Sequence, residues 1–215
     1  MEKKTYLKIR KAYSDLGMKI VESEPESEKL IRIAGKRLGF LSGNTFVFED
    51  EEETGQLMDF LLYEKVRYEL RAVDRFRERK PVLSSLEEEI LDSMINARNS
   101  VFEIGRINES EKTLTLFDLF TEEEYTLFEV GLSQSAGSGV LLYSRLLPIR
   151  EVHITSGVSF PFFPQDKGRL LSSISRGKSR KRRFSSRKKK PARTLYEIAI
   201  ECYRSFGIPV IHKNA

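Results

Sequence analysis

The sequence predicts a mixed α+β protein with an N-terminal helix and short meander, a helical hairpin, a small five-stranded antiparallel β barrel or bent sheet, and a C-terminal helix. Apolar residues recur at helical spacing in the first and last parts of the chain and alternate at strand spacing in the middle. The chain has 215 residues, 40% of them apolar, including 14 Phe and 8 Tyr. This supply is sufficient for a hydrophobic core and argues against wholesale disorder.

This pattern divides the chain into five expected segments. They are a small α+β segment (1–53), a helical hairpin (54–99), a barrel-like unit (100–164), a basic, disordered loop (165–193) and a C-terminal helix with a strand (194–215).

The first segment opens with a helix over residues 2–16, where apolar side chains recur every three or four positions. Gly17 is expected to end this helix. Short apolar runs between glycine-containing turns then predict a small antiparallel meander. Its strands are expected at residues 18–21, 30–33 and 45–48.

Five consecutive acids, residues 49–53, follow the meander. Such a run is either a divalent cation site or a solvated turn that places negative charge before the next helix. The run lacks the alternating spacing and the glycine of a calcium-binding loop, so we favour the turn.

Two helices are expected next, over residues 56–79 and 84–98. Lys80-Pro81 ends the first, because a residue before proline avoids the helical conformation. Ser84 and Glu87 have the spacing of a capping box at the start of the second. The short linker predicts that the two helices pair as an antiparallel hairpin.

Five strand-like runs follow at about ten-residue spacing, which is typical of a small barrel or bent sheet. They cover residues 101–107, 113–117, 124–129, 140–147 and 152–155, and Pro148 is expected to break the fourth. A barrel of this size is filled by side chains, so no ligand cavity is expected. The Pro- and Phe-rich residues 159–164 make a poor strand. They either cap the open end of a core, which we favour, or form a recognition surface.

Charge is distributed unevenly along the chain, whose net charge is +5. Residues 176–193, the basic segment, contain eleven Lys and Arg and no acid, so the rest of the chain is acidic overall. A helix expected at 192–206, followed by a strand at 208–211, makes this segment a loop. Repulsion between its charges predicts that it is disordered in the free protein.

Three functional interpretations remain open. The first is a non-catalytic nucleic-acid-binding protein, in which the basic loop neutralises phosphates of RNA or DNA and Phe184 stacks on a base. The second is a protein–protein interaction module whose basic loop solubilises it or contacts an acidic protein. The third is an unrecognised hydrolase that uses carboxylates. The candidate nucleic-acid-binding residues are Arg176, Lys178, Arg180, Lys181, Arg182, Arg183, Phe184, Arg187, Lys188, Lys189 and Lys190.

The sequence offers little of the usual catalytic chemistry. His153, His212 and Cys202 are too few for a typical zinc site, and no nucleophile elbow or phosphate-binding loop is present. We therefore assign no catalytic residue, expect no cofactor or metal, and favour a protein that is not an enzyme. Without a signal-like N-terminus or an apolar run of membrane-span length, we expect a cytoplasmic protein with no membrane span. Its oligomeric state is open.

Several short motifs carry a resemblance that covers about half of the chain. They are Met58-Asp59-Phe60-Leu61-Leu62-Tyr63, Pro81 with Leu83-Ser84, Glu88-Glu89, Ser100-Val101-Phe102-Glu103, Leu116-Phe117-Asp118-Leu119, Gly131-Leu132-Ser133-Gln134, Arg145-Leu146-Leu147-Pro148, Gly157 and Pro161. In these residues the chain resembles an uncharacterised bacterial family. Its members look like a helical segment followed by a small β domain, sometimes joined to a cysteine-rich SEC-C zinc motif. That motif is absent here. The resemblance implies the helix-then-barrel architecture and no activity.

Overall fold

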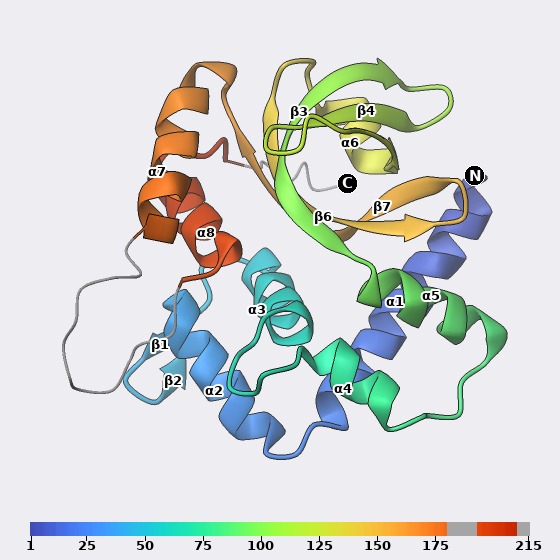
Figure 1. Ribbon diagram of the computed structural model, residues 1–215, viewed down its shortest axis with the longest axis vertical. Helices are drawn as coiled ribbons and strands as arrows, with labels where there is room; N and C mark the ends of the chain where they lie inside the picture. The colour runs from blue at the N-terminus through green and yellow to red at the C-terminus, as the bar shows by residue number, and fades with distance from the viewer. Residues whose placement is uncertain (180–192, 210–215) are drawn as a thin grey trace. The chain divides into compact units, whose positions relative to one another are not determined.

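The computed structural model describes residues 1–179 and 193–209, and the chain divides into two compact units (Figure 1). The helical unit comprises residues 1–98, 127–130 and 145–158. The barrel unit comprises residues 99–126, 131–144 and the chain from 159 onward. Four of the barrel strands, β3, β5, β6 and β7, therefore have residues in both units. No helix in the described part of the chain is both long and apolar enough to cross a bilayer.

The helical unit is built from five helices and a small hairpin. They are α1 (Lys3–Glu22), α2 (Ser27–Leu38), β1 (Leu41–Ser42), β2 (Thr45–Phe46), α3 (Glu52–Tyr63), α4 (Ala72–Glu78) and α5 (Ser85–Ile95). Helix α1 packs against α3, α4 and α5, and α3 also packs against α2 and α4 (Figure 1). Their shared apolar faces form the core of this unit.

The predicted meander is wrong except for its last strand. Residues 18–21 continue α1, residues 30–33 lie in α2, and only the β1–β2 hairpin is extended. Gly17 does not end α1, because it is buried where the helix passes Leu62 closely. Burial of Leu30, Ala34 and Leu38 at four-residue spacing stabilises α2 as an amphipathic helix.

The predicted long helix over residues 56–79 is two helices. Helix α3 ends at Tyr63, where Glu64 becomes extended, and α4 begins after Arg71. Asp74 accepts the backbone N–H of Arg71 at 3.3 Å, which favours a new helix start. The capping box predicted at the next helix is confirmed, since Ser84 Oγ accepts from Glu87 N at 3.3 Å.

The five predicted strands are confirmed as a closed barrel. They are β3 (Arg98–Asn108), β4 (Thr113–Asp118), β5 (Glu124–Phe128), β6 (Leu141–Ile149) and β7 (Val152–Phe162), in the order β3-β4-β5-β7-β6. Helix α6 (Val130–Ser135) lies between β5 and β6 in sequence. The expectation of an all-antiparallel barrel is wrong in one respect, because β5 and β7 pair in parallel. A strand joined by a crossover rather than a hairpin allows that direction.

Two proline expectations are also wrong. Strand β6 runs through Pro148 to Ile149, and β7 runs through Pro161 to Phe162. Phe160 and Phe162 are fully buried, so burial of the aromatic rings outweighs the ladder hydrogen bond that a proline lacks. The segment 159–164 is thus largely a core strand of the barrel unit.

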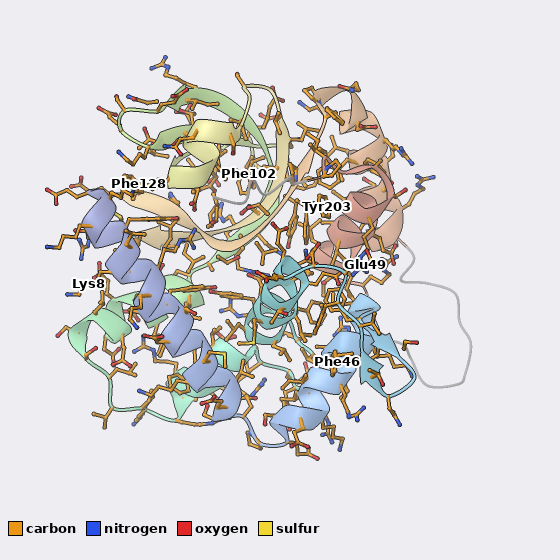
Figure 2. The ribbon with its side chains drawn as sticks, turned by 180° about the vertical axis from the view of Figure 1, so that it is seen from behind. Lys8, Phe46, Glu49, Phe102, Phe128 and Tyr203 are labelled. Carbon is orange, nitrogen blue, oxygen red and sulfur yellow. The ribbon has the colours of Figure 1, made fainter. Side chains whose placement is uncertain are left out.

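The C-terminal part of the barrel unit contains the short 3₁₀ helix η1 (Pro164–Asp166), α7 (Lys167–Ser179) and α8 (Leu195–Phe206). Helix α7 packs against α8 (Figure 1). Tyr203 of α8, labelled in Figure 2, stacks on Phe160 with ring centroids 5.1 Å apart. The loop expected over 165–193 is therefore helical in its first half. The expected C-terminal helix is confirmed. Of the expected strand, residues 208–209 form no strand, although the Ile208 N–H donates to the Pro161 backbone oxygen at 2.9 Å, and residues 210–211 lie outside the described part.

Candidate nucleic-acid interface

Helix α7 buries one face and exposes another. Leu170 and Ile174 are fully buried, one turn apart. The opposite side is a shallow, open depression in the surface, lined by Gly168, Arg169, Leu171, Ser172, Ser175 and Arg176. Arg169, Ser172 and Arg176 recur at spacings of three and four, so they share one side of the helix. We call this side the α7 face.

All charged side chains in the sequence of α7 are basic. The helix contains Lys167, Arg169, Arg176 and Lys178 and no acid, and Asp166 precedes it. Arginine and serine side chains both donate hydrogen bonds, and these residue types make many of the contacts that proteins form with phosphate oxygens. The α7 face therefore has the donors and the charge that a polyanion requires.

Several interactions hold this face in place. The guanidinium of Arg169 lies 3.9 Å from the ring centroid of Phe206 on α8. Arg176 donates through Nε to the backbone oxygen of Ser172 at 3.3 Å. Ser173 Oγ donates to the backbone oxygen of Arg169 at 2.9 Å. Because these contacts join neighbouring turns and two helices, the cations are partly pre-positioned.

Only the beginning of the sequence-predicted site falls within the described residues. Arg176 is exposed on the α7 face, and Lys178 is placed in the last turn of α7 by its backbone. The others lie outside the described part of the chain: Arg180, Lys181, Arg182, Arg183, Phe184, Arg187, Lys188, Lys189 and Lys190.

Sequence reasoning missed the upstream half of the interface. Arg169, Ser172 and Ser175 were assigned to a loop, although Leu170, Leu171 and Ile174 have helical spacing. That spacing was the available signal. It was obscured because the following run of positive charge dominates the composition of the segment.

The helical unit contains a buried charge cluster that could suggest chemistry. Arg145 lies 3.2 Å from Asp59 and 2.9 Å from Glu64, and its guanidinium sits 4.3 Å from the ring centroid of Tyr63. Tyr63 and Tyr13 in turn share a hydroxyl contact of 3.2 Å. Burial raises the pKa of the Glu64 carboxyl, although the Arg145 guanidinium acts in the opposite direction. The cluster is a closed network of paired groups, which fits a structural role.

A second cluster links α1 to Glu129, which follows β5, and to Thr155 within β7. Arg10 donates to Tyr6 Oη at 2.8 Å, to the Thr155 backbone oxygen at 2.5 Å and to Glu129 at 2.5 Å. Its donors thus point in three directions at once. Phe128, labelled in Figure 2, packs its ring 5.3 Å from that of Tyr6 and covers the same region. A guanidinium whose three nitrogens all have partners also fits a structural role.

One cavity in the helical unit is small. A cavity of about 10 Å³ is lined by Glu24, Glu64, Arg75 and six mainly apolar neighbours. It has room for a single water molecule. Small-molecule sites typically measure roughly 300–1,000 Å³. This cavity therefore does not suit a substrate.

The acidic run at 49–53 forms a turn and the start of α3. The Glu49 N–H donates to Glu53 Oε2 at 2.7 Å, and the Glu53 N–H donates to Asp50 Oδ1 at 3.0 Å. These backbone-to-side-chain hydrogen bonds within the run agree with the predicted turn before α3. Within residues 1–179 and 193–209, no three His, Cys, Asp or Glu side chains are grouped as a metal site requires. Cys202 is buried on α8, and this burial raises the pKa of its thiol.

Comparison with known proteins supports the family expectation. The family model described as Family of unknown function (DUF7986) matches residues 1–213. No curated protein and no solved structure matches the chain significantly.

Proposed function

The chain belongs to this family of unknown function, and from its own surface we propose that it is a non-catalytic nucleic-acid-binding protein acting through the α7 face and the basic segment. The carrying observation is that α7, a helix with only basic charges, leads directly into that segment. Together, residues 167–193 contain thirteen Lys and Arg and no acid.

The physical basis is phosphate neutralisation with release of counterions. If the basic loop stood alone against an otherwise acidic protein surface, the loop would be better explained as a tether than as a binding surface. A basic helix that extends the segment into the folded barrel unit favours a binding surface. Arg169 and Arg176 lie seven residues apart on α7, which is about two helical turns. Two cations at that distance can each contact a phosphate of the same strand.

The barrel topology is compatible with this proposal. In barrel order the strands run first-second-third-fifth-fourth, and the third and fifth are parallel. OB-folds are also five-stranded barrels, and they bind oligonucleotides or oligosaccharides. Such a likeness is an analogy at the level of the fold and assigns no residue. We therefore place the nucleic acid on the α7 face and leave the barrel strands out of the proposal.

The test is a salt titration of binding to short single-stranded RNA and to duplex DNA. One variant replaces Arg169 and Arg176 by Gln. A second replaces seven basic residues by Ser: Arg180, Lys181, Arg182, Arg183, Lys188, Lys189 and Lys190. We expect affinity to fall steeply with salt for the intact chain. In each variant the slope should shrink by ~0.7 per lost contact on single strands and ~0.9 on duplex DNA.

The matched control replaces Lys4 and Lys8, two exposed lysines of α1, by Gln. It removes the same charge as the α7 variant and should leave the slope unchanged. Arg169→Lys keeps the charge and separates it from the stacking on Phe206. Absence of binding by the intact chain at moderate salt would refute the proposal. Equal losses in the control and the α7 variant would refute the role of the α7 face.

A further inference from the structure

A second surface of the barrel unit has the opposite character. On β4, Phe117 leaves 41% of its surface exposed. Its ring lies across Gly105 of β3, where an added Cβ would stand 2.6 Å from Phe117 Cε2. The glycine therefore lets a large aromatic ring lie directly on the outer side of the sheet.

Carboxylates flank this ring on both neighbouring strands. Glu103 is opposite Phe117 in the antiparallel register of β3 and β4, which lie side by side in Figure 1. The Asp118 N–H donates to the backbone oxygen of Glu123 at 2.9 Å, so the next residue pair of the β4–β5 hairpin places Glu124 opposite Phe117. Opposite residues share a face of the sheet, and the three side chains form one row.

The turn after β4 is built to be rigid. The buried Asp118 carboxylate accepts from Ser100 Oγ at 2.8 Å, from Phe120 N at 2.8 Å and from Thr121 N at 3.3 Å. This turn holds Phe120 42% exposed and adds Glu122 at its tip. Exposed aromatic rings on a pre-organised support are typical of binding surfaces.

The stretch of chain that carries the rings is acidic. Residues 103–124 contain seven acids and only two bases, Arg106 and Lys112. Of these acids Asp118 is buried, and Glu109 and Glu111 lie in the β3–β4 loop away from the rings, so Glu103 and residues 122–124 supply the negative charge beside them. Lys167 Nζ already lies 2.7 Å from Glu103, so one ammonium group is attracted to the row. A phosphate backbone would be repelled here. A guanidinium or ammonium would be attracted both by the ring face and by the carboxylates beside it.

We propose that this surface, the Phe117 face, binds an arginine- or lysine-rich segment of a partner protein. A cationic side chain would lie over the Phe117 ring between Glu103 and Glu124, and Phe120 would contact the apolar part of the same segment. This partner differs from the nucleic acid assigned to the α7 face. The two proposals can therefore fail independently.

The probe is a short labelled peptide of alternating arginine and alanine, compared with the same peptide carrying glutamine for arginine. Binding to the full chain is measured by fluorescence anisotropy. We expect Glu124→Gln and Phe117→Leu each to weaken binding of the arginine peptide about threefold to fivefold. Glu111→Gln is the matched control, since it removes one exposed carboxylate from the β3–β4 loop, away from the row. It should leave the affinity nearly unchanged.

Three outcomes would overturn the proposal. If Glu111→Gln and Glu124→Gln weakened peptide binding equally, the binding would depend only on the overall negative charge of the surface and not on the Phe117 face. Equal binding of the arginine and glutamine peptides would remove the cationic requirement. Sedimentation that shows the chain self-associating without peptide, with loss of that association in Glu124→Gln, would assign the face to a second copy. Thermal unfolding of each variant shows that it is folded, and Glu124→Gln changes only the charge of an exposed side chain.

Discussion

Arg145 on β6 and Asp59 on α3 form an ion pair at 3.2 Å, although 86 residues separate them in the sequence. Both side chains are less than 5% exposed, and Glu64 joins the same guanidinium at 2.9 Å. One cation thus serves two buried carboxylates in the helical unit. This imbalance leads to a prediction in which the two acids behave differently.

We expect Asp59→Asn to lower the free energy of unfolding by about 3 kcal/mol, because it removes the more buried partner of a buried cation. Glu64→Gln should cost much less at neutral pH, because it leaves one balanced pair. Urea denaturation of both variants measures the difference. Glu151→Gln, the same change at an exposed position, is the control. Equal losses for Asp59→Asn and Glu64→Gln would contradict this account.

The pH dependence of stability provides a separate check on Glu64. Burial raises the pKa of this carboxyl in the folded chain above its ordinary value. The folded state then holds the proton more tightly than the unfolded state. Stability from this group is present below the ordinary glutamate pKa and is lost as pH rises through the folded pKa. Glu64→Gln should flatten that slope in a urea series across pH, whereas Glu151→Gln should retain it.

Tyr6 should ionise late in an alkaline titration. Burial, together with the Glu129 carboxylate and against the pull of Arg10, raises its pKa to about 12. Burial also raises the pKa values of Tyr13 and Tyr63. We expect tyrosinate absorbance to show a delayed component, part of which disappears in Tyr6→Phe. The folded chain should lose stability as pH rises above the ordinary tyrosine pKa. A single unshifted transition while the chain stays folded would contradict the prediction.

Ser84 should contribute more to the free energy of unfolding than its neighbour Ser85. Its hydroxyl and backbone N–H both pair with Glu87, at 3.3 Å from Glu87 N and 2.8 Å from Glu87 Oε2. Ser84→Ala removes the cap of α5, and we expect a loss of about 1 kcal/mol in the free energy of unfolding. Ser85→Ala, one position into the helix, should be neutral or slightly stabilising, because alanine is the better helix former. Thermal or urea unfolding distinguishes the two.

Two glycines of α7 should respond in opposite ways to alanine. A Cβ on Gly177 would overlap the Ile198 side chain of α8, whereas a Cβ on Gly168 would meet no atom within 4 Å. Gly168→Ala should therefore stabilise by up to about 1 kcal/mol through helix propensity. Gly177→Ala should destabilise through overpacking by about 1–3 kcal/mol. Equal effects of the two substitutions in urea unfolding would show that α7 and α8 do not pack as closely as described.

Local signals account for the parts of the fold that sequence reasoning predicted. The five barrel strands follow from short strand-like runs at about ten-residue spacing, and the start of α5 follows from the spacing of Ser84 and Glu87. The contrast between a basic segment and an acidic remainder is likewise a property of composition. These features depend on residues that are close together along the chain, so no partner from another part of the chain is needed to recognise them.

Only the tertiary structure decided the rest. Residues 18–22 and 27–38 are helical because Gly17 passes close to Leu62 and an apolar stripe of α2 is buried. Prolines stand within β6 and β7 because their aromatic and aliphatic neighbours fill a core. The parallel pairing of β5 with β7 and the carboxylates on both sides of Phe117 depend on register between strands. In each case contacts with residues far along the chain outweigh a local conformational preference. The local preference can be recognised in the sequence, but the distant contact cannot.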